Sequence, residues 1–242
     1  DKAGDNSVAS TNISLNLAYH LIMDQRNTLG MGLYGAFGQR SIGFAAGTWG
    51  SQYNGLTHDP SLSSNETFNS QSFSFIDVGA GLVYTYKENS GRMTKNNKRS
   101  FNAGVAFFHL NNPSYSFIEN DTEKLYMRWS VFANGIIPIG NSKGTLLPGF
   151  YLNRQKTNME IVYGTYYRYT INEGSQYTGN IKPFFFSLGA FHRWNDALIA
   201  KVMLEWYEYS VGFAYDVNIS GLTPYSRARG GMEFFVRYNM EI

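Results

Sequence analysis

The chain has 242 residues and a net charge of +2 at pH 7, which is too small to indicate a nucleic-acid partner. It has no cysteine, which excludes disulfides and thiolate metal sites. Charged residues make up 16% of the chain and aromatic residues 17%, and there are 25 glycines. This composition is typical of outer-membrane barrels, with a soluble all-β protein as the alternative.

Apolar and polar residues alternate with a period of two in one run after another, which predicts strands with two different faces. Eleven strands are predicted, at about 12–23, 28–39, 72–86, 100–110, 125–139, 145–153, 159–171, 182–194, 197–207, 208–219 and 227–242. No apolar set continues at helical spacing, and no stretch approaches 18 consecutive apolar residues, so neither a long helix nor a transmembrane helix is expected.

The segment 40–71 is a long polar stretch between the second and third strands, rich in Gly, Ser and Asn. Loops of this length are usually functional or disordered. One interpretation is a mobile cap over the mouth of a barrel. The other is that Trp49, Tyr53 and Phe68 are exposed anchors for a partner protein.

The last third of the chain shows the alternation most clearly. Leu198, Val202 and Leu204 fall on one face of their strand, and Lys201 and Glu205 fall on the other. A soluble sandwich turns its apolar face inward, whereas a membrane barrel turns that face towards lipid. The alternation alone does not separate the two, but the composition and the strand lengths favour an antiparallel transmembrane β-barrel of the outer-membrane type.

The order of the strands predicts on which side of the membrane each connection lies. We treat residues 1–242 as a single barrel domain and place the long loop 40–71 outside the cell, because outer-membrane barrels have long extracellular loops. Asp1 then also falls outside and the strand count is odd, whereas a closed antiparallel barrel needs an even count. We therefore expect an incomplete barrel whose natural form has further strands before Asp1.

Five segments resemble one protein family. They are the entry at 1–4; STNISLNLAYHL at 10–21; FIDVGAGLVYTY at 75–86 with FNAGVAFFHLNNP at 101–113; SLGAFHRWNDALIAKVMLEW at 187–206; and YSVGFAYDVNISGL at 209–222 with GGMEFFVRYN at 230–239. Together they resemble the PorP/SprF family of Bacteroidota outer-membrane proteins. The family's last strand pair has a glycine-tyrosine-aspartate strand and then an arginine followed by an aromatic residue, found here as Gly212, Tyr215 and Asp216 and as Arg237 and Tyr238.

The resemblance implies a location in the bacterial outer membrane and about fourteen strands in the complete barrel. It also implies a non-enzymatic role in type IX secretion and gliding motility. The partners that it implies are outer-membrane lipid, other components of the secretion system, and secreted adhesins that carry a type B C-terminal domain. The longer segments 40–71 and 87–99 depart from the family pattern, which weakens any transfer of loop functions.

Charged residues on the polar strand faces form the first candidate site, a charge network in the barrel lumen. Its members are Asp77, Arg128, Lys201, Glu205, Asp216, Glu233, Arg237 and Glu241. Such a set either fills the barrel interior structurally or lines a polar pathway for a solute. Its mixed sign argues against strong selectivity for anions or cations. The second candidate site is the partner loop with Trp49, Tyr53 and Phe68.

No catalytic or metal-binding pattern is found. The four histidines, His20, His58, His109 and His192, have no partners at metal-ligand spacing. No nucleophile elbow or phosphate loop occurs. We therefore expect no enzyme, no cofactor and no metal. Two alternatives stay open, namely an outer-membrane channel for small or hydrophobic solutes and a surface β-sandwich used for adhesion.

Overall fold

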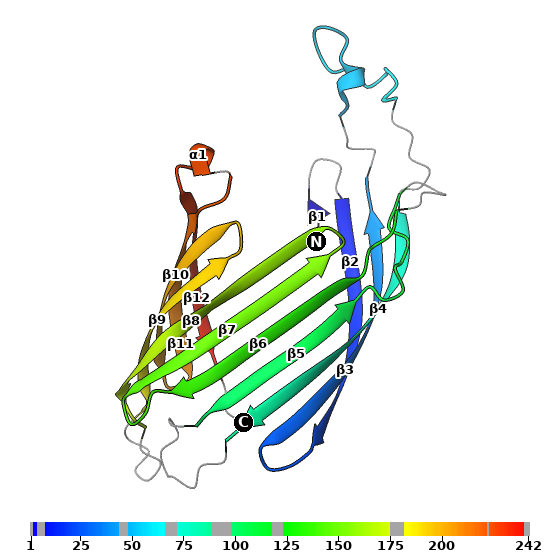
Figure 1. Ribbon diagram of the computed structural model, residues 1–242. Coiled ribbons are helices and arrows are strands. Elements are labelled where there is room, and N and C mark those ends of the chain that lie inside the picture. The colour runs from blue at the N-terminus through cyan, green and yellow to red at the C-terminus, as the bar shows by residue number, and fades with distance from the viewer. Residues whose placement is uncertain are drawn as a thin grey trace. The chain divides into compact units, whose positions relative to one another are not determined.

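The computed structural model of the chain describes residues 2–3, 8–43, 48–65, 72–88, 98–117, 123–174, 182–221 and 223–239. Neighbouring strands in the sequence are hydrogen-bonded neighbours, in the order β1 to β12 (Figure 1). The strands are β1 (Lys2–Ala3), β2 (Val8–Ile22), β3 (Asn27–Ser41), β4 (Ser72–Lys87), β5 (Ser100–Phe108), β6 (Arg128–Pro138), β7 (Gly144–Gln155), β8 (Asn158–Asn172), β9 (Phe184–Arg193), β10 (Ala197–Trp206), β11 (Tyr209–Asn218) and β12 (Arg229–Tyr238). The chain is therefore an all-β protein with antiparallel pairing.

Strands β2 to β12 correspond one to one to the predicted strands, with shifted ends. The strand expected at 100–110 already ends at Phe108, because His109 has a left-handed backbone with φ 58°. The strand expected from 125 begins only at Arg128, since Leu125 donates a hydrogen bond to the carbonyl of Pro113 (2.9 Å) within the preceding loop. A four-residue helix, α1 (Thr223–Ser226), forms where a plain loop was expected. In the described ranges, no helix has the length and apolarity needed to cross a membrane.

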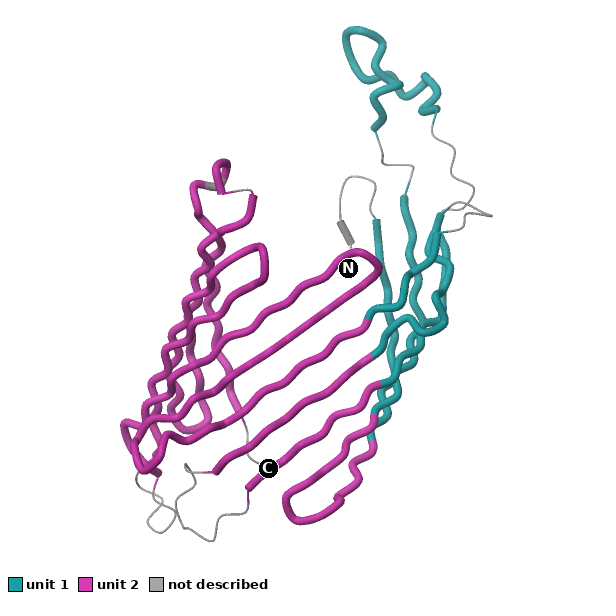
Figure 2. The backbone as a smooth tube through the Cα atoms, viewed as in Figure 1, with its two compact units in different colours: residues 1–18, 32–80, 107–128 teal, residues 19–31, 81–106, 129–242 magenta. Residues whose placement is uncertain are grey.

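The chain divides into two compact units (Figure 2). Unit 1 comprises residues 1–18, 32–80 and 107–128, and unit 2 comprises residues 19–31, 81–106 and 129–242.

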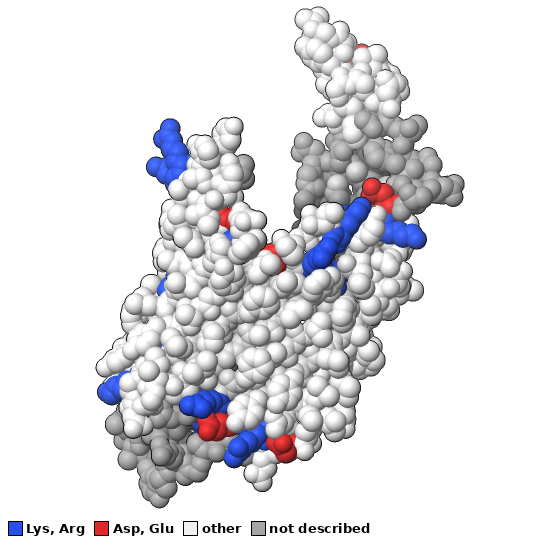
Figure 3. All heavy atoms as spheres, viewed as in Figure 1, with Lys and Arg blue, Asp and Glu red and all other residues white. Residues whose placement is uncertain are grey.

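One face of unit 2, the outer face, is apolar and exposed. Strand register aligns its side chains in rows across β8 to β12, such as Tyr167, Leu188, Val202, Phe213 and Phe234, and next to it Tyr169, Phe186, Leu204, Val211 and Val236. Leu188 is 50% exposed and Phe234 is 70% exposed. On the face of β7 and β8 seen in Figure 3, charged atoms gather near the strand ends and the middle is free of colour. Isolated exposed apolar side chains are common, but rows of them need an apolar surrounding.

Two aromatic rows flank this outer face. At one end, the Trp206 end, Phe184, Trp206, Tyr209 and Tyr238 lie side by side in register. At the other, the Trp194 end, the His192 ring lies 5.3 Å from Tyr163 and 5.9 Å from Trp194, centroid to centroid. Leu198 and Trp206 are eight positions apart on β10, which is about 27 Å of strand. Tilted strands of this length fit the apolar band and aromatic girdles of an outer-membrane protein.

The opposite face of unit 2, the inner face, is polar and closely packed. Ser187 is fully buried there, and Ile199, Ser210 and Ala214 are also buried. Ser187, Ser210 and Ala214 are small, and larger residues pair with the last two, as Lys201 does with Ala214 and Glu205 does with Ser210. Burial in unit 2 is thus inverted relative to a soluble domain, in which the large apolar residues are inside.

Unit 1 contains the first halves of β2 and β4 and the loop after β5. In this loop, Tyr115 and Phe117 fold onto β4, with ring centroids 5.2 and 4.7 Å from Phe73. The guanidinium of Arg40 lies 5.0 Å above the Tyr115 ring. Phe73 has the same strand parity as Asp77, so this aromatic cluster covers the polar face of β4.

Asp24 closes the turn between β2 and β3. Its Oδ1 accepts hydrogen bonds from the backbone N–H groups of Arg26 (2.7 Å) and Asn27 (2.8 Å), and its Oδ2 accepts one from the Asn27 amide (2.7 Å). The bond from the Asn27 side chain, followed by that from the Arg26 backbone, lowers the pKa of Asp24. The ionised carboxylate therefore stabilises the turn.

We expect the replacement Gly164→Ala to destabilise the sheet. A Cβ atom at Gly164 would meet the carbonyl oxygen of Ala190 and lie 2.6 Å from the Phe191 Cα, both in the backbone of β9. The sheet has to shift to admit it, which costs about 1–3 kcal/mol of unfolding free energy. Urea unfolding in detergent, followed by tryptophan fluorescence, measures this loss. Gly231→Ala, which meets nothing within 4 Å, is the control and should leave the midpoint unchanged.

We expect the stabilising effect of Asp24 to depend on pH. Because its pKa is lower in the folded than in the unfolded chain, its contribution is full above the unfolded pKa of about 4 and is lost as the pH falls through the folded value. Asp24→Asn should therefore unfold at lower urea than the wild type at neutral pH, and the two curves should converge below about pH 4. A difference that keeps its size in acid would contradict this.

Candidate functional site

The predicted charge network divides between the two units. Lys201, Glu205, Asp216, Glu233 and Arg237 belong to unit 2, whereas Asp77 and Arg128 belong to unit 1, and Glu241 lies outside the described residues.

In unit 2 the five charged residues share the inner face but are not paired directly. Lys201, Ala214 and Glu233 form one transverse row, and Glu205, Ser210 and Arg237 form another. A small residue thus separates the two charges of each row. Glu233 and Arg237 are exposed on β12, whereas the Lys201 ammonium lies 4.9 Å from the centroid of the Phe191 ring.

Asp216 takes part in an ion-pair cluster around Arg193. Its Oδ2 lies 3.1 Å from Nη2 of Arg193, whose Nη1 lies 3.0 Å from Oδ2 of Asp196. Glu160 adds a longer contact of 3.8 Å to Nε of the same arginine. At the Trp194 end, Arg193 thus links three parts of the chain, which are β8, the turn that precedes β10, and β11.

Arg168 and Glu205 are half-buried charged residues of the inner face. The Arg168 guanidinium lies 4.8 Å above the Phe185 ring. Arg168 Nε, Glu205 Oε2 and the hydroxyl of Ser187 are buried and have no hydrogen-bond partner among the described residues. Arg168 pairs with Ser187 in register, and Glu205 pairs with Phe185. Unsatisfied buried polar atoms are rare in proteins, so these three atoms distinguish this part of the inner face.

In unit 1, Asp77 forms a buried pair with His109. The Asp77 Oδ2 lies 2.8 Å from Nδ1 of His109, at the corner where β5 ends. Asn111 fixes the same corner, since its side-chain amide donates to the carbonyl of Ile76 (2.6 Å) and its Oδ1 accepts from the N–H of Val78 (3.3 Å). The Asp77–His109 pair and Asn111 hold the loop after β5 onto β4.

Arg128 lies at the start of β6, with its guanidinium 4.6 Å above the Phe108 ring. Phe108 in turn contacts Tyr34 edge to face, with centroids 5.9 Å apart. Arg128 is therefore held by an aromatic surface, which is a favourable cation–π arrangement.

The described part of the partner loop, residues 48–65, folds into a compact structure that we call the loop knob. The 3-10 helix η2 (Gly50–Gln52) begins it, and Tyr53 and His58 form a β-bridge. The Gln52 amide donates to the carbonyl of Leu62 (3.1 Å), and its Oε1 accepts from the N–H of Trp49 (3.3 Å). The knob is therefore held by its own hydrogen bonds.

The exposed side chains of the loop knob differ in part from the predicted ones. Tyr53 is 59% exposed, as an anchor residue requires, but Trp49 is half-buried. Phe68 lies outside the described residues. The residue that the sequence analysis missed is Leu56, which is 87% exposed at the tip between the bridged Tyr53 and His58.

Other residues missed by the sequence analysis are Arg193, Arg168 and His109. Arg193 is an even number of positions from Ser187 and Gly189 on β9. The alternation of this strand therefore indicated that Arg193 lies on the same polar face as these two residues. Arg168 lies among tyrosines, and nothing in the sequence indicates on which face it lies. Among the described residues, no group of three or more His, Asp or Glu side chains is placed to hold a metal ion.

Comparison with known proteins identifies a family. The family model described as "Type IX secretion system membrane protein PorP/SprF" matches residues 1–238 of the chain, which confirms the resemblance seen in the sequence. A search of the curated proteins finds no match.

We expect the Arg193 cluster to stabilise unit 2. Arg193→Gln leaves Asp216, Asp196 and Glu160 close together without their cation, and should lower the unfolding free energy by about 1–2 kcal/mol, since the cluster is partly exposed. Arg154→Gln, an exposed arginine of β7, is the matched control and should have little effect. Chemical unfolding in detergent measures both. Equal effects of the two variants would refute a special role for Arg193.

Proposed function

The chain belongs to the PorP/SprF family of type IX secretion system membrane proteins, and from this we propose that it is an outer-membrane β-barrel that helps to export or anchor secreted adhesins. The observation that carries the barrel proposal is the inverted burial of unit 2. Its large apolar side chains are exposed in rows and bordered by two aromatic belts, while serine and alanine are buried on the other face.

Closure of the barrel is supported by the edge strand of unit 2. Among the described residues of this unit, β12 pairs with β11 alone. Both its faces are exposed, including Phe234 on the apolar face and Glu233 on the polar face. An open edge in lipid leaves backbone N–H and C=O groups unsatisfied, at a cost of several kcal/mol for each group. We propose that this edge pairs with a further strand, and that the closed barrel has about fourteen strands.

The loop knob supports the proposed interaction with cargo. It presents Tyr53 and Leu56 on a scaffold that is already ordered by internal hydrogen bonds, so little conformational entropy is lost when a partner binds. We place the knob outside the cell, where it would hold an adhesin through a type B C-terminal domain. By the order of the antiparallel strands, the turns at Asp24–Asn27 and at Tyr207 would then face the periplasm and the other secretion components.

The charged inner face would fill the barrel as a structural network. Its charges are of both signs and alternate with small residues. A channel for solutes is the competing proposal, and it predicts conductance. Recordings from planar bilayers distinguish the two, because a filled lumen is silent and an open pore is not. The family assignment supports a secretion role without catalysis.

We expect loss of the knob's apolar side chains to weaken cargo binding. The double replacement Tyr53→Ser and Leu56→Ser should weaken binding of a secreted C-terminal domain to the purified chain about tenfold or more, as for truncation of interface anchor residues. Surface display of the adhesin should fall in cells that carry this variant. Thr57→Ala is the control on the same knob and should bind like the wild type.

Two outcomes would contradict the proposal. If adhesins reach and stay on the cell surface after deletion of the gene, the barrel has no anchoring role. If deletion abolishes display but the double variant does not, the cargo is held elsewhere than at the knob.

A further inference from the structure

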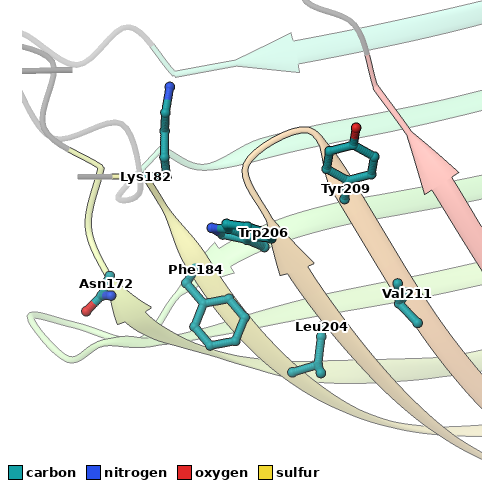
Figure 4. Close-up of a pocket in the computed structure, with 7 residues that line it drawn as sticks. All are labelled: Asn172, Lys182, Phe184, Leu204, Trp206, Tyr209 and Val211. Atoms are coloured by element: carbon teal, nitrogen blue, oxygen red, sulfur yellow. The ribbon is translucent and has the colours of Figure 1, made fainter. Parts of the chain in front are cut away.

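An apolar groove of about 790 Å³ lies on the outer face of unit 2, at the Trp206 end. It is lined by Asn172, Lys182, Phe184, Leu204, Trp206, Tyr209 and Val211 (Figure 4). Phe184, Trp206 and Tyr209 belong to the aromatic belt, and Leu204 and Val211 form the next row towards the middle of the strands. The groove therefore runs from the belt into the apolar band.

The polar groups of the groove belong to Lys182, Asn172 and the belt residues Trp206 and Tyr209, whereas Phe184, Leu204 and Val211 are apolar. In Figure 4, Lys182 and Asn172 lie at one side of the view, Leu204 and Val211 lie at the other, and Trp206 lies between them. A ligand that fits must accordingly be amphipathic, with a polar group at the belt and an apolar chain along the strands.

A β-bulge brings Asn172 to this groove. Thr170 pairs with Phe185 on the inner face, whereas Asn172 pairs with Phe184 on the outer face, and the register shifts between them. In a regular strand, Thr170 and Asn172 are two positions apart and would point to the same face. Without the register shift, Asn172 would therefore lie on the inner face with Thr170. Bulges commonly re-aim a side chain. Here the bulge places an amide on a face that is otherwise apolar.

Lys182 is held at the groove by Tyr207. Its ammonium lies 3.7 Å from the centroid of the Tyr207 ring, and the Tyr207 N–H donates to the carbonyl of Pro183 (3.1 Å). Tyr207 has a left-handed backbone with φ 56°, a conformation that glycine or asparagine adopts more readily. No carboxylate lies within ion-pair distance of Lys182 among the residues described. Its positive charge is thus oriented without being neutralised.

We propose that this groove binds one anionic glycerophospholipid. The lipid phosphate would meet the Lys182 ammonium and the Asn172 amide, and an acyl chain would lie over Leu204 and Val211. Charge complementarity selects this occupant, since the groove joins an ammonium that has no carboxylate partner among the described residues, and an amide donor, to an apolar surface in the belt, where lipid headgroups lie. The inference concerns a specific lipid site and does not depend on the proposed cargo.

The test is native mass spectrometry of the full chain in delipidated detergent micelles. It would be titrated with phosphatidylglycerol, with phosphatidylcholine of the same acyl chains, and with inorganic phosphate. The wild type should retain one phosphatidylglycerol in preference to phosphatidylcholine. Lys182→Gln should weaken phosphatidylglycerol binding about fivefold, as expected for one basic residue at a lipid surface, and should leave phosphatidylcholine binding nearly unchanged.

A second pair of variants tests the apolar part of the groove. Val211→Trp fills the groove and should also reduce phosphatidylglycerol binding, whereas Val202→Trp, on the same outer face but outside the groove lining, should not. Equal retention of both lipids by all variants would overturn the proposal and indicate ordinary annular lipid. If inorganic phosphate competes as well as phosphatidylglycerol does, the site is an anion site and the lipid assignment is wrong.

Discussion

The structure depends on one constraint. A sheet that exposes rows of apolar side chains to an apolar medium must form all of its backbone hydrogen bonds within the protein. In hydrocarbon, no water is available to satisfy a free N–H or C=O group, so every strand needs neighbours. The ladders of β7 to β12 meet this need along nearly their whole length. Once the backbone is satisfied in this way, side chains such as Leu188 and Phe213, whose strands are paired on both sides, are stable where they are exposed.

The same constraint explains the composition of the inner face. Curved, tilted strands bring inner side chains close together, so small residues are needed between large ones. Gly164 lies against the backbone of Phe191, and Ser187 is fully buried next to the long side chain of Arg168. The high glycine content and the low charge of the sequence are therefore two results of one packing requirement. On β10, each inner charged side chain pairs with a small residue of β11, Lys201 with Ala214 and Glu205 with Ser210.

The alternation of residues was enough to predict most of the sheet, because a period of two fixes which side chains share a face. It assigned Lys201, Glu205 and Asp216 to one face before any register was known. It failed where local geometry breaks the period. The strand predicted at 159–171 was expected to end before Asn172, but a bulge extends β8 to Asn172 on the outer face, and the left-handed His109 ends β5 early. The alternation also could not predict which side chains of the loop knob are exposed. Trp49 and Leu56 are positioned by hydrogen bonds of Gln52 and Asn54, and not by a repeating pattern in the sequence.

These interruptions of the period are also where chemical specificity can arise. A regular strand offers lipid only a uniform apolar surface, which cannot distinguish one headgroup from another. Asn172 adds a hydrogen-bond donor to that surface because of the bulge, and Lys182 adds a charge because the strained Tyr207 holds it. Backbone strain of this kind persists only when its surroundings enforce it. In this molecule, the hairpin from β10 to β11 and the Tyr207–Pro183 hydrogen bond hold Tyr207 in its left-handed conformation. The aromatic belt therefore carries a charged group and an amide at the groove, beside its aromatic side chains.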